Sequence, residues 1–399
     1  MRILFVAFQD SVHTARWVSQ LVGHGWDIHL FPSTLQGGPH PLLSSVGIQR
    51  HYPAILRLSL RALHKAADIQ DNPTLKRWFS KDPHPLTAYW LSRVIRQVRP
   101  DIIHSLEFQH AGYLVLEARE RLHGNLPPWI AGNWGSDIYL FGKLPSHAPR
   151  VRAILEACDY YTCECQRDVG LALDMGLKGT PLPVLPNAGG FDLEVAGRLR
   201  APGPASERRT IVLKGYQHWA GRALVGLHAI ELCAADLRGY RVVIPLASPE
   251  VQLAAELVAQ RTGLSIEVLP RCAYEEMLRL YGCARIYLGL SISDAISQSM
   301  LEAIVMGAFP IQSCTACTDE WIIDGENGLV VPPEDPQIVA AALRRALTDD
   351  ALVDDAADHN SRLAADRLDA KFIQPKALAI YERVYRETHQ LDPRGSKTA

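Results

Sequence analysis

Short apolar runs alternate with segments of helical periodicity along most of this chain, in two successive series. The second series begins at residue 210, and the first has apolar runs at residues 2–8, 26–33, 101–107, 128–134 and 160–165. Runs of this length are typical of buried strands. Strands that alternate with helices form a parallel sheet with helices on both faces. The chain is therefore predicted to contain two α/β domains, each built on a parallel sheet.

A segment rich in Gly, Pro and Arg separates the two series at residues 186–209 and is typical of a linker. The 399 residues are also too many for one ordinary core. We predict an N-terminal Rossmann-like domain over 1–190, a linker over 191–209 and a C-terminal Rossmann-like domain over 210–372. A helix over 373–390 is expected to pack back on the N-terminal domain, and residues 391–399 are expected to be a disordered tail.

The composition excludes several functional classes. The formal net charge is -2, so no basic field indicates nucleic-acid binding. No apolar run reaches the about 18 residues of a membrane-spanning helix, and "MRILFVAF" is too short for a signal-peptide core. We expect a cytoplasmic protein with eight reduced cysteines. Neither Cys163-Glu-Cys165 nor the pair Cys314 and Cys317 has the additional ligands of a zinc site, so no metal is expected.

The stretch "LGLSISDAISQSMLEAIVMGAFPIQS" at 288–313 places two acids around a predicted helix start. A loop at 291–297 follows a strand, a helix follows at 298–306, and Gly307 ends it. The free N–H groups and the dipole at this helix start favour an anion such as a diphosphate. Asp294 and Glu302 could bind sugar and ribose hydroxyls beside it. The alternative is structural, because Ser299 and Glu302 also fit a capping box and Asp294 could be an ordinary loop acid.

From Ser293 onward the sequence closely resembles the donor-binding region of the family 4-like glycosyltransferases. The family has two acids separated by seven residues, then a helix, a glycine, a proline-headed strand and a glycine-containing turn. Here these are Asp294 and Glu302, Gly307, Pro310 and "DGENGLVVPP" at 324–333. A looser match covers "CDYYTCECQRD" (158–168) and "VLPNAGGFD" (184–192). The resemblance implies the GT-B fold, an α/β fold in which two Rossmann-like domains have parallel sheets facing across a cleft.

The resemblance also assigns the donor side of the site. Glu302 matches the acid that binds the donor ribose, and Asp294 matches the acid near the donor sugar, where the family usually has Glu. These two are the predicted catalytic residues. The loop whose amides meet the diphosphate is matched by Ser297, Gln298 and Ser299.

The segment "VLKGYQHWAGRAL" (212–224) occupies the place of the family's glycine-rich phosphate segment, and Gly215 and Gly221 match its two glycines. The family's phosphate-binding Arg and Lys correspond by count to Tyr216 and Ala220. We therefore predict that Lys214 and Arg222, one or two positions away, bind the donor phosphates instead. The alternative is that these two cations are only a solvated strand end and a helix start.

In the first domain, "NWGSDIY" (133–139) matches a family motif that often carries a histidine, and that position is Trp134 here. The acceptor-side candidates are Trp134, Ser136, Asp137, His13 and His110, and His104 and Glu107 follow the same strand as His110. Each has a plainer alternative: Asp137 could cap a helix, and a lone histidine is more often a packed or surface residue.

The resemblance implies transfer of a sugar from a nucleoside-diphosphate sugar to an acceptor hydroxyl, with retention at the anomeric carbon. No cofactor is expected, since the nucleotide sugar is the substrate, and the absence of an Asp-x-Asp pair fits a metal-independent transferase. The sequence does not identify the acceptor, which is a glycan, a lipid-linked molecule or a small molecule. The basic and aromatic stretch at 57–99 could contact an anionic membrane peripherally, although a solvated helical face is the favoured reading.

Two other functions remain as alternatives. A nucleotide-sugar epimerase of the GT-B fold is the nearest enzyme, and a non-catalytic GT-B scaffold is the other. A dinucleotide dehydrogenase is disfavoured because "VAFQDSVHTA" after the first strand lacks the Gly-x-Gly-x-x-Gly motif.

Overall fold

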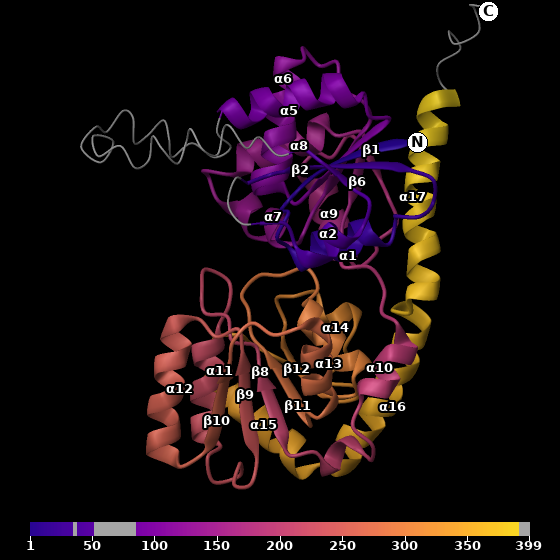
Figure 1. Ribbon diagram of the computed structural model, residues 1–399. Helices are drawn as coiled ribbons and strands as arrows, with labels where there is room; N and C mark the ends of the chain where they lie inside the picture. The colour runs from indigo at the N-terminus through magenta and orange to yellow at the C-terminus, as the bar shows by residue number, and fades with distance from the viewer. Residues whose placement is uncertain (35–37, 52–84, 391–399) are drawn as a thin grey trace, which may run out of the picture. The chain divides into compact units, whose positions relative to one another are not determined.

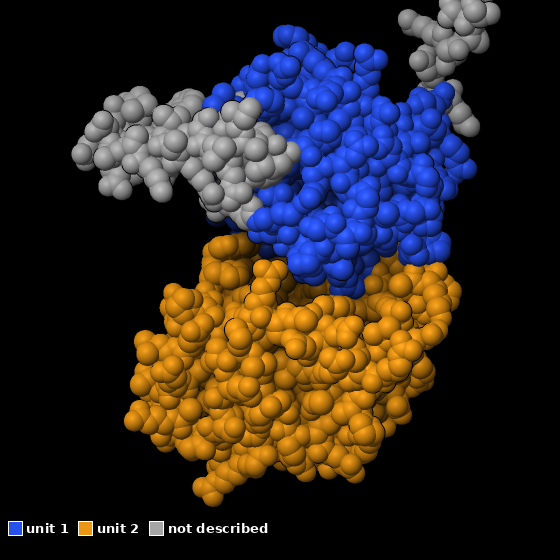
Figure 2. All heavy atoms as spheres, viewed as in Figure 1, with its two compact units in different colours: residues 1–189, 374–399 blue, residues 190–373 orange. Residues whose placement is uncertain are grey.

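The computed structural model describes residues 1–34, 38–51 and 85–390, which form two compact units (Figure 2). Unit 1 comprises Met1–Gly189 together with Gln374–Ala399, and unit 2 comprises Gly190–Ile373. Each unit has its own parallel sheet with helices between successive strands, so the predicted α/β class is confirmed. None of the helices in the described ranges is long and apolar enough to cross a membrane.

Unit 1 has a seven-stranded parallel sheet whose central strands are buried on both faces. Along the sheet the order is β3 (Gln49–Arg50), β2 (Asp27–Pro32), β1 (Arg2–Ala7), β4 (Ile102–Leu106), β5 (Trp129–Gly132), β6 (Tyr160–Thr162) and β7 (Thr180–Pro181). The register pairs Ile3 with both Ile28 and Ile102. Continuous apolar runs are the expected sequence of strands covered on both sides.

The helices of unit 1 connect these strands (Figure 1). They are α1 (Val12–Ser19), α2 (Pro41–Ser45), α5 (Pro85–Val98), the π-helix η2 (Phe108–Gly112), α6 (Tyr113–Arg121), α7 (Ser136–Tyr139), η3 (Phe141–Lys143), α8 (Ala148–Ala157) and α9 (Gln166–Asp174). The first helix ends at Ser19, before the glycines at residues 23 and 25. Most of the predicted basic stretch, residues 57–84, lies outside the described residues.

The long helix α17 (Ala370–Gln390) begins in unit 2 and continues in unit 1. In unit 1 its Tyr381 is fully buried, accepts a hydrogen bond from Trp17 Nε1 at 2.7 Å and lies 2.8 Å from His104 Nδ1. Burial lowers the pKa of His104 to about 3, so this imidazole is a neutral core group. His104, which sequence reasoning noted beside the acceptor-side candidates, is therefore packed against α17 in the core of unit 1.

Unit 2 has a six-stranded parallel sheet with its own apolar core. Its strands, in sheet order, are β10 (Ser265–Leu269), β9 (Arg241–Pro245), β8 (Thr210–Leu213), β11 (Ile286–Gly289), β12 (Phe309–Ser313) and β13 (Leu329–Val331). The helices are α10 (Leu193–Leu199), α11 (Ala223–Leu232), α12 (Pro249–Thr262), α13 (Tyr274–Gly282), α14 (Gln298–Val305), α15 (Pro336–Thr348) and α16 (Asp350–Arg367).

The segment 191–209, predicted as a linker, has structure of its own within unit 2. It contains α10 and the short 3-10 turn η4 (Ala205–Glu207). Asp192 caps α10 by accepting hydrogen bonds from the N–H groups of Glu194 and Val195. A Gly- and Pro-rich composition concealed this helix because an N-cap signal followed by only seven helical residues is weak in sequence.

The order of the strands reverses at one point in each sheet. In unit 1 the reversal lies between β1 and β4, and in unit 2 between β8 and β11. Ligands of open α/β sheets bind beyond the carboxyl ends of the strands at such a switch point. The topology therefore directs attention to the residues that follow these four strands.

Candidate functional site

The switch point of unit 2 brings a cation and an acid together. Lys214 directly follows β8, and Asp294 lies in the loop after β11. Lys214 Nζ lies 3.4 Å from Asp294 Oδ2 and 3.2 Å from Ser297 Oγ. Both charged side chains are partly shielded, with 16% and 27% of their surfaces exposed. Of the sequence predictions for the donor side, Lys214, Asp294 and Ser297 thus lie within one contact network.

The charge of Lys214 is secured by its neighbours. Burial lowers the pKa of Lys214, but the attraction of Asp294, with Tyr287 and Tyr216 nearby, outweighs burial and leaves that pKa raised. A raised pKa keeps the ammonium charged throughout the neutral range. The site therefore holds a permanent positive charge at the carboxyl end of β8.

Helix α14 adds the positive end of its dipole to the same place. Ser297 is its N-cap, yet the Ser297 side chain makes no capping bond and instead faces Lys214. The helix begins at Gln298, so Ser299 lies inside the first turn and cannot act as the cap of a capping box. The capping-box alternative is therefore wrong, and the hydroxyls of Ser297 and Ser299 have other partners.

These partners form a hydroxyl cluster beneath the helix start. The Tyr287 hydroxyl lies 2.8 Å from Ser299 Oγ and 3.3 Å from Ser297 Oγ, and the two serine oxygens are 3.1 Å apart. Tyr287 is fully buried in β11, and burial raises the pKa of its hydroxyl. The cluster fixes both serines beside the N–H groups of the first helical turn, which have no acceptor within their own helix.

Glu302 lies one turn further along α14 and is half-buried. The pKa of Tyr281 is raised well above its usual value, first by burial and then by the charge of Glu302. Gln298, also predicted to meet the donor, is the first residue of the helix and is half-buried. Asp294, Gln298 and Glu302 are therefore carried by one loop and the helix that follows it.

Arg222, the second predicted phosphate ligand, contacts its own loop. Arg222 Nη1 donates to the carbonyl oxygens of His218, Ala220 and Gly221, and Nε donates to Glu334 at 3.1 Å. The two predicted glycines also serve this loop. A Cβ on Gly215 would lie 2.5 Å from Pro245 O, and one on Gly221 would overlap the Tyr216 backbone. In this arrangement Arg222 shapes the loop, and Lys214 is the cation that faces Asp294.

In unit 1, Asp137 is buried and its carboxylate is directed at the backbone. Asp137 Oδ2 accepts from Trp134 N at 2.8 Å and from Phe108 N at 3.2 Å. Burial, followed by the charge of Glu107, raises the pKa of Asp137 well above its usual value. Glu107 in turn accepts from the N–H groups of His110 and Ala111 and has a φ of 76°. Both carboxyls hold the segments that follow β4 and β5, and Ser136 lies half-buried in the same turn.

The other acceptor-side candidates of unit 1 form an aromatic group at its switch point. The ring centroids of His13 and Trp134 are 5.6 Å apart, and those of Phe8 and His110 are 4.8 Å apart. Phe8 also lies 6.3 Å from Trp134. These half-buried rings follow β1, β4 and β5, so the structure brings together three residues predicted separately, His13, His110 and Trp134.

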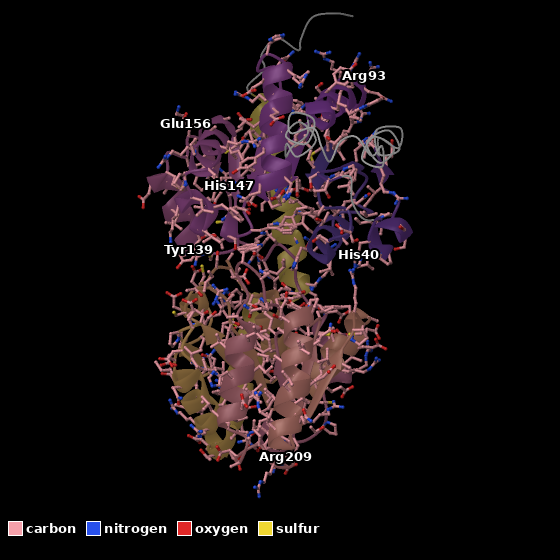
Figure 3. All side chains as sticks on the ribbon, turned by 90° about the vertical axis from the view of Figure 1, so that its left-hand side faces the viewer. His40, Arg93, Tyr139, His147, Glu156 and Arg209 are labelled. Atoms are coloured by element: carbon pink, nitrogen blue, oxygen red, sulfur yellow. The ribbon has the colours of Figure 1, made fainter. Side chains whose placement is uncertain are left out.

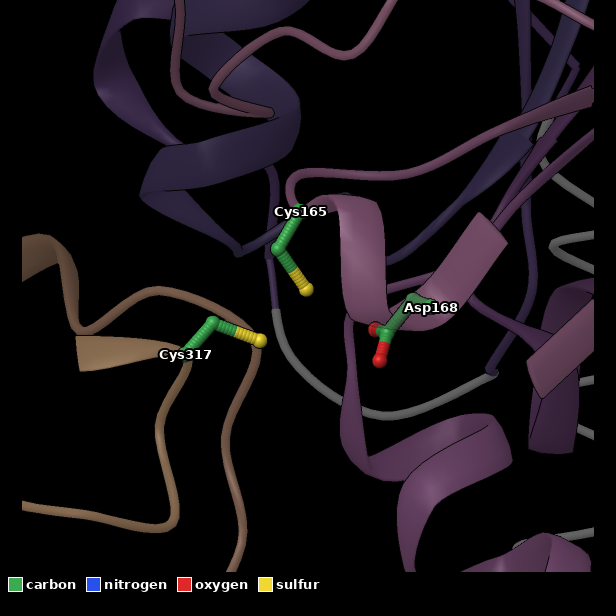
Figure 4. Close-up of side chains that lie close together, drawn as sticks. All are labelled: Cys165, Asp168 and Cys317. Atoms are coloured by element: carbon green, nitrogen blue, oxygen red, sulfur yellow. The ribbon is translucent and has the colours of Figure 1, made fainter. Parts of the chain in front are cut away.

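The polar side chains of the segment "CECQRD" (163–168) bind neighbouring residues of unit 1 and so stabilise the fold. Figure 4 shows Cys165 and Asp168 at the start of α9, while Cys317 in the same view belongs to unit 2. Asp168 is fully buried and accepts from Asn133 Nδ2 at 2.8 Å and Arg167 Nε at 2.9 Å. The Arg167 guanidinium covers the ring of Tyr139, which is labelled in Figure 3. None of the eight cysteines, all of which lie in the described ranges, forms a disulfide.

Sequence reasoning missed Tyr287 and Tyr281 as parts of the donor-side cluster. Tyr287 lies in an apolar strand segment, and Tyr281 lies near the end of an amphipathic helix. The available signal was chemical, because a tyrosine in a buried strand needs a hydrogen-bond partner for its hydroxyl. Tyr287 in "RIYLGL" met that condition two residues before the strand's end.

Comparison with known proteins gives two family matches and a shared fold. The model described as "Glycosyl transferases group 1" matches residues 218–349, and the model described as "Glycosyl transferase 4-like" matches residues 49–164. Together these matches span more than half of the chain. No curated protein matches the chain significantly in sequence.

Solved structures resemble the chain over nearly its whole length. Anabaena HepE in complex with UDP-glucose is 11% identical, with a TM-score of 0.70 over 96% of this chain and 100% of that one. Sucrose-phosphate synthase from Thermosynechococcus elongatus is 13% identical, with a TM-score of 0.69 over 97% and 100%. A glycosyltransferase from Rickettsia africae is 14% identical, with a TM-score of 0.66 over 96% and 98%. At these identities the likeness shows the fold.

Proposed function

This chain belongs to the family 4-like glycosyltransferases, and we propose that it transfers a sugar from a UDP-sugar to an acceptor hydroxyl with retention at the anomeric carbon. The observation that carries the proposal is the placement of Lys214 Nζ between Asp294 Oδ2 and Ser297 Oγ at the start of α14. A fixed cation beside a helix N-terminus at a switch point suits a diphosphate.

The choice of UDP rests on proteins of the same fold. HepE has been solved with UDP-glucose, with UDP and glucose, and with UDP. A related E. coli structure holds UDP-2-fluoro glucose. We extend the UDP-sugar class to this chain as part of the proposal, with Glu302 on the ribose hydroxyls and Asp294 on the hydroxyls of the transferred sugar.

In the proposed reaction the bond between the anomeric carbon and the β-phosphate oxygen breaks, and a bond from that carbon to the acceptor oxygen forms. The acceptor proton passes to the departing phosphate oxygen, so UDP is the second product. Lys214, Ser297 and Ser299 stabilise the negative charge that develops on the diphosphate. We propose that this charge stabilisation needs no metal ion, which EDTA treatment of the enzyme would test.

The acceptor hydroxyl is assigned to unit 1 in this proposal. The group formed by Phe8, His13, His110 and Trp134 follows β1, β4 and β5 and lies at the switch point of that sheet. The buried carboxyls Asp137 and Glu107 support these segments from below by accepting backbone N–H groups. We place Asp137 in a positioning role, without contact to the acceptor.

The first test replaces Lys214 with Met, which keeps the length of the side chain and removes its charge. We expect the Lys214→Met variant to bind UDP about 10- to 100-fold more weakly in calorimetry, because a hydrogen bond to a charged group is worth about 1.5–3 kcal/mol. Transfer should fall at least as much, measured as UDP release in the presence of an acceptor.

Lys371→Met is the matched control, since Lys371 is an exposed cation of unit 2 paired with Glu194. It should leave UDP affinity unchanged. Equal UDP affinity in the Lys214→Met and wild-type proteins would contradict the assigned donor site. NMR of the product anomer would decide between retention and inversion.

A further inference from the structure

The loop between β8 and α11 exposes three aromatic rings in four residues. Tyr216 is 39% exposed and Trp219 is 55% exposed, and His218 is exposed between them. Aromatic side chains that are exposed side by side, unlike singly scattered ones, are a feature of ligand- and partner-binding sites. By count, Tyr216 and Ala220 stand where relatives carry the phosphate-binding Arg and Lys, so the family pattern does not account for these rings.

The rings form a continuous row that starts at the donor site. Lys214 Nζ lies 5.8 Å from the centroid of the Tyr216 ring. The Tyr216 and His218 centroids are 5.8 Å apart, and those of His218 and Trp219 are 5.3 Å apart. The row therefore extends from the proposed diphosphate position outward along one loop of unit 2.

Hydrogen bonds hold this loop in a defined shape. Arg222 binds three of its carbonyl oxygens, and Gln217 N donates to Ser248 Oγ at 2.9 Å. The loop is also tied to the segment that leads to Asp294, because Ile292 N donates to Ala220 O at 2.9 Å. A loop this well anchored keeps its aromatic side chains in place, which lowers the entropy cost of binding a ligand.

His218 has a fixed hydrogen-bonding role within the row. Its Nδ1 accepts from the N–H groups of Ala220 at 3.1 Å and Gly221 at 3.4 Å. In the neutral ring the proton is then on Nε2, which becomes a hydrogen-bond donor. Burial, followed by the charge of Lys214, lowers the pKa of His218 and favours this neutral form. The row thus combines two aromatic faces with one oriented donor.

We propose that the aromatic row Tyr216, His218 and Trp219 is a pyranose-binding subsite, in which a sugar ring packs on Trp219 and a sugar hydroxyl accepts from His218 Nε2. One face of a pyranose is lined by C–H groups and its rim by hydroxyls, so aromatic surface with a few polar groups suits it. The inference rests on the proposed function. The sugar can come from the donor or from the acceptor, and the two sources are separable by experiment.

The test compares Trp219→Ala and Trp219→Phe with the wild-type enzyme. Calorimetry gives the affinity for UDP and for UDP-glucose, and saturation-transfer NMR gives binding of methyl glucoside to the UDP complex. Trp219→Ala should weaken binding of the sugar-bearing probe about three- to tenfold and leave UDP affinity unchanged. Trp219→Phe should recover part of the loss. A loss for UDP-glucose identifies the donor sugar, and a loss for methyl glucoside identifies the acceptor.

Phe372→Ala is the matched control, because Phe372 is an exposed aromatic residue of unit 2 with the same 55% exposure. It should change none of these affinities. Equal weakening of UDP and UDP-glucose by Trp219→Ala would assign the ring to the nucleobase and overturn the proposal, as would no change with either probe. A wild-type protein that fails to bind UDP contradicts the proposed function itself.

Discussion

At the residue scale, Asp294 has two roles in the proposed site, and they have opposite effects on the affinity for the donor. Its carboxylate neutralises part of the Lys214 charge at 3.4 Å, and in the proposed site it also binds the transferred sugar. A diphosphate must compete with this carboxylate for Lys214. In the proposed site we therefore expect the acid to weaken binding of the nucleotide alone and to favour the complete sugar donor.

This competition predicts a divergence between binding and turnover in the Asp294→Asn variant. Removing the carboxylate charge should tighten UDP binding by about two- to fivefold, since a partly exposed charge pair is worth up to about 1 kcal/mol. Transfer from UDP-glucose should fall by at least tenfold, because the sugar loses a charged hydrogen-bond acceptor. Calorimetry with UDP and a UDP-release assay measure the two effects.

Asp355→Asn changes the net charge equally at an exposed position of α16 and serves as the control. It should alter neither quantity. Weaker UDP binding in Asp294→Asn would mean that the carboxylate supports the nucleotide, contrary to the competition described above.

Single residues divide clearly into those that the sequence could predict and those that it could not. Asp294, Glu302 and Ser297 were predictable because they share one loop and the helix that follows it. Arg222 was predicted as a phosphate ligand, but its bonds to three loop carbonyls depend on the path of the loop, which no local pattern reveals. The directions of the Asp137 and Asp168 carboxylates depend likewise on neighbours 29 to 35 residues away.

At the scale of elements, helix α14 is stabilised at its carboxyl end by a group that matches its dipole, whereas its start faces a cation. Lys214 and the serine hydroxyls face its start, where the site is. At its other end Gly307 adopts a φ of 72°, and the buried Arg208 donates to the carbonyl oxygens of Met306 and Gly307. Cations at the carboxyl end offset the negative end of the dipole. Arg208 thereby holds the carboxyl end of the helix in place, far from the candidate site at its start.

Strand β11 lies beneath the first turn of α14 and contacts it through Tyr287. We predict that adding one methyl group at Gly289 of this strand strongly lowers the stability of unit 2. A Cβ on Gly289 would overlap the Tyr287 hydroxyl and Gln312 Oε1, both buried. Gly289→Ala should destabilise unit 2 by about 1–3 kcal/mol, the usual cost of overpacking a core. It should also weaken UDP binding, because Tyr287 must move away from Ser299. Chemical denaturation and calorimetry measure these changes.

Gly197→Ala is the matched control in the same unit. Gly197 lies in α10, and a Cβ there meets no atom within 4 Å. The substitution should be neutral or stabilise unit 2 by about 0.5–1 kcal/mol, because alanine favours a helix interior over glycine. Similar stabilities for the two variants would contradict this prediction, because they would show that Tyr287 and Gln312 can move to accommodate the added methyl group.

Most long elements could be predicted from periodicity, whereas the short ones could not. The strands β1, β2, β4 and β5 agree with the predicted ranges to within two residues at each end, since continuous apolar runs define them. The π-helix η2 and helix α10 were missed. Both are shorter than two full helical turns, so neither shows a clear periodicity in sequence. The start of η2 is fixed by a local cap, in which Glu107 accepts from the backbone N–H groups of His110 and Ala111.

At the scale of the whole molecule, the chain passes between the units twice, after Gly189 and after Ile373. On the unit 2 side these two connections are hydrogen-bonded to each other. Phe191 N donates to Leu368 O at 2.8 Å, and Ala370 N donates to Phe191 O at 2.8 Å. A Cβ on Gly190 would lie 2.5 Å from Ala370 Cα, so this close approach requires glycine. The sequence predicted a returning helix but could not show that the two connections pair.

Because unit 1 contains residues from both ends of the sequence, we predict that ending the chain at Ile373 destabilises unit 1 selectively. The deletion removes Ala377, Ile380, Tyr381 and Val384, which are at most 2% exposed. Each large apolar side chain contributes about 1.5–3 kcal/mol on burial, so the loss is comparable with the whole stability of a domain. Calorimetry should show a lost or lowered transition for unit 1, while UDP still raises the transition of unit 2.

Glu382→Ala tests whether the effect belongs to the buried face of α17. Glu382 is exposed on the same helix, next to Tyr381. Its substitution should leave both transitions in place. A truncated protein with an unchanged unit 1 transition would contradict the structural role assigned to α17.

The division of unit 1 between two distant segments also sets an order of events on the ribosome. Its first strand is translated before unit 2, yet Trp17 and His104 meet Tyr381 only after all of unit 2 has been synthesised. Unit 2 is a continuous segment and can be completed earlier, so the unit that is begun first is finished last. Until α17 has been synthesised, the nascent chain exposes the apolar surface of unit 1 that α17 later covers. Chaperones bind exposed apolar surfaces of this kind.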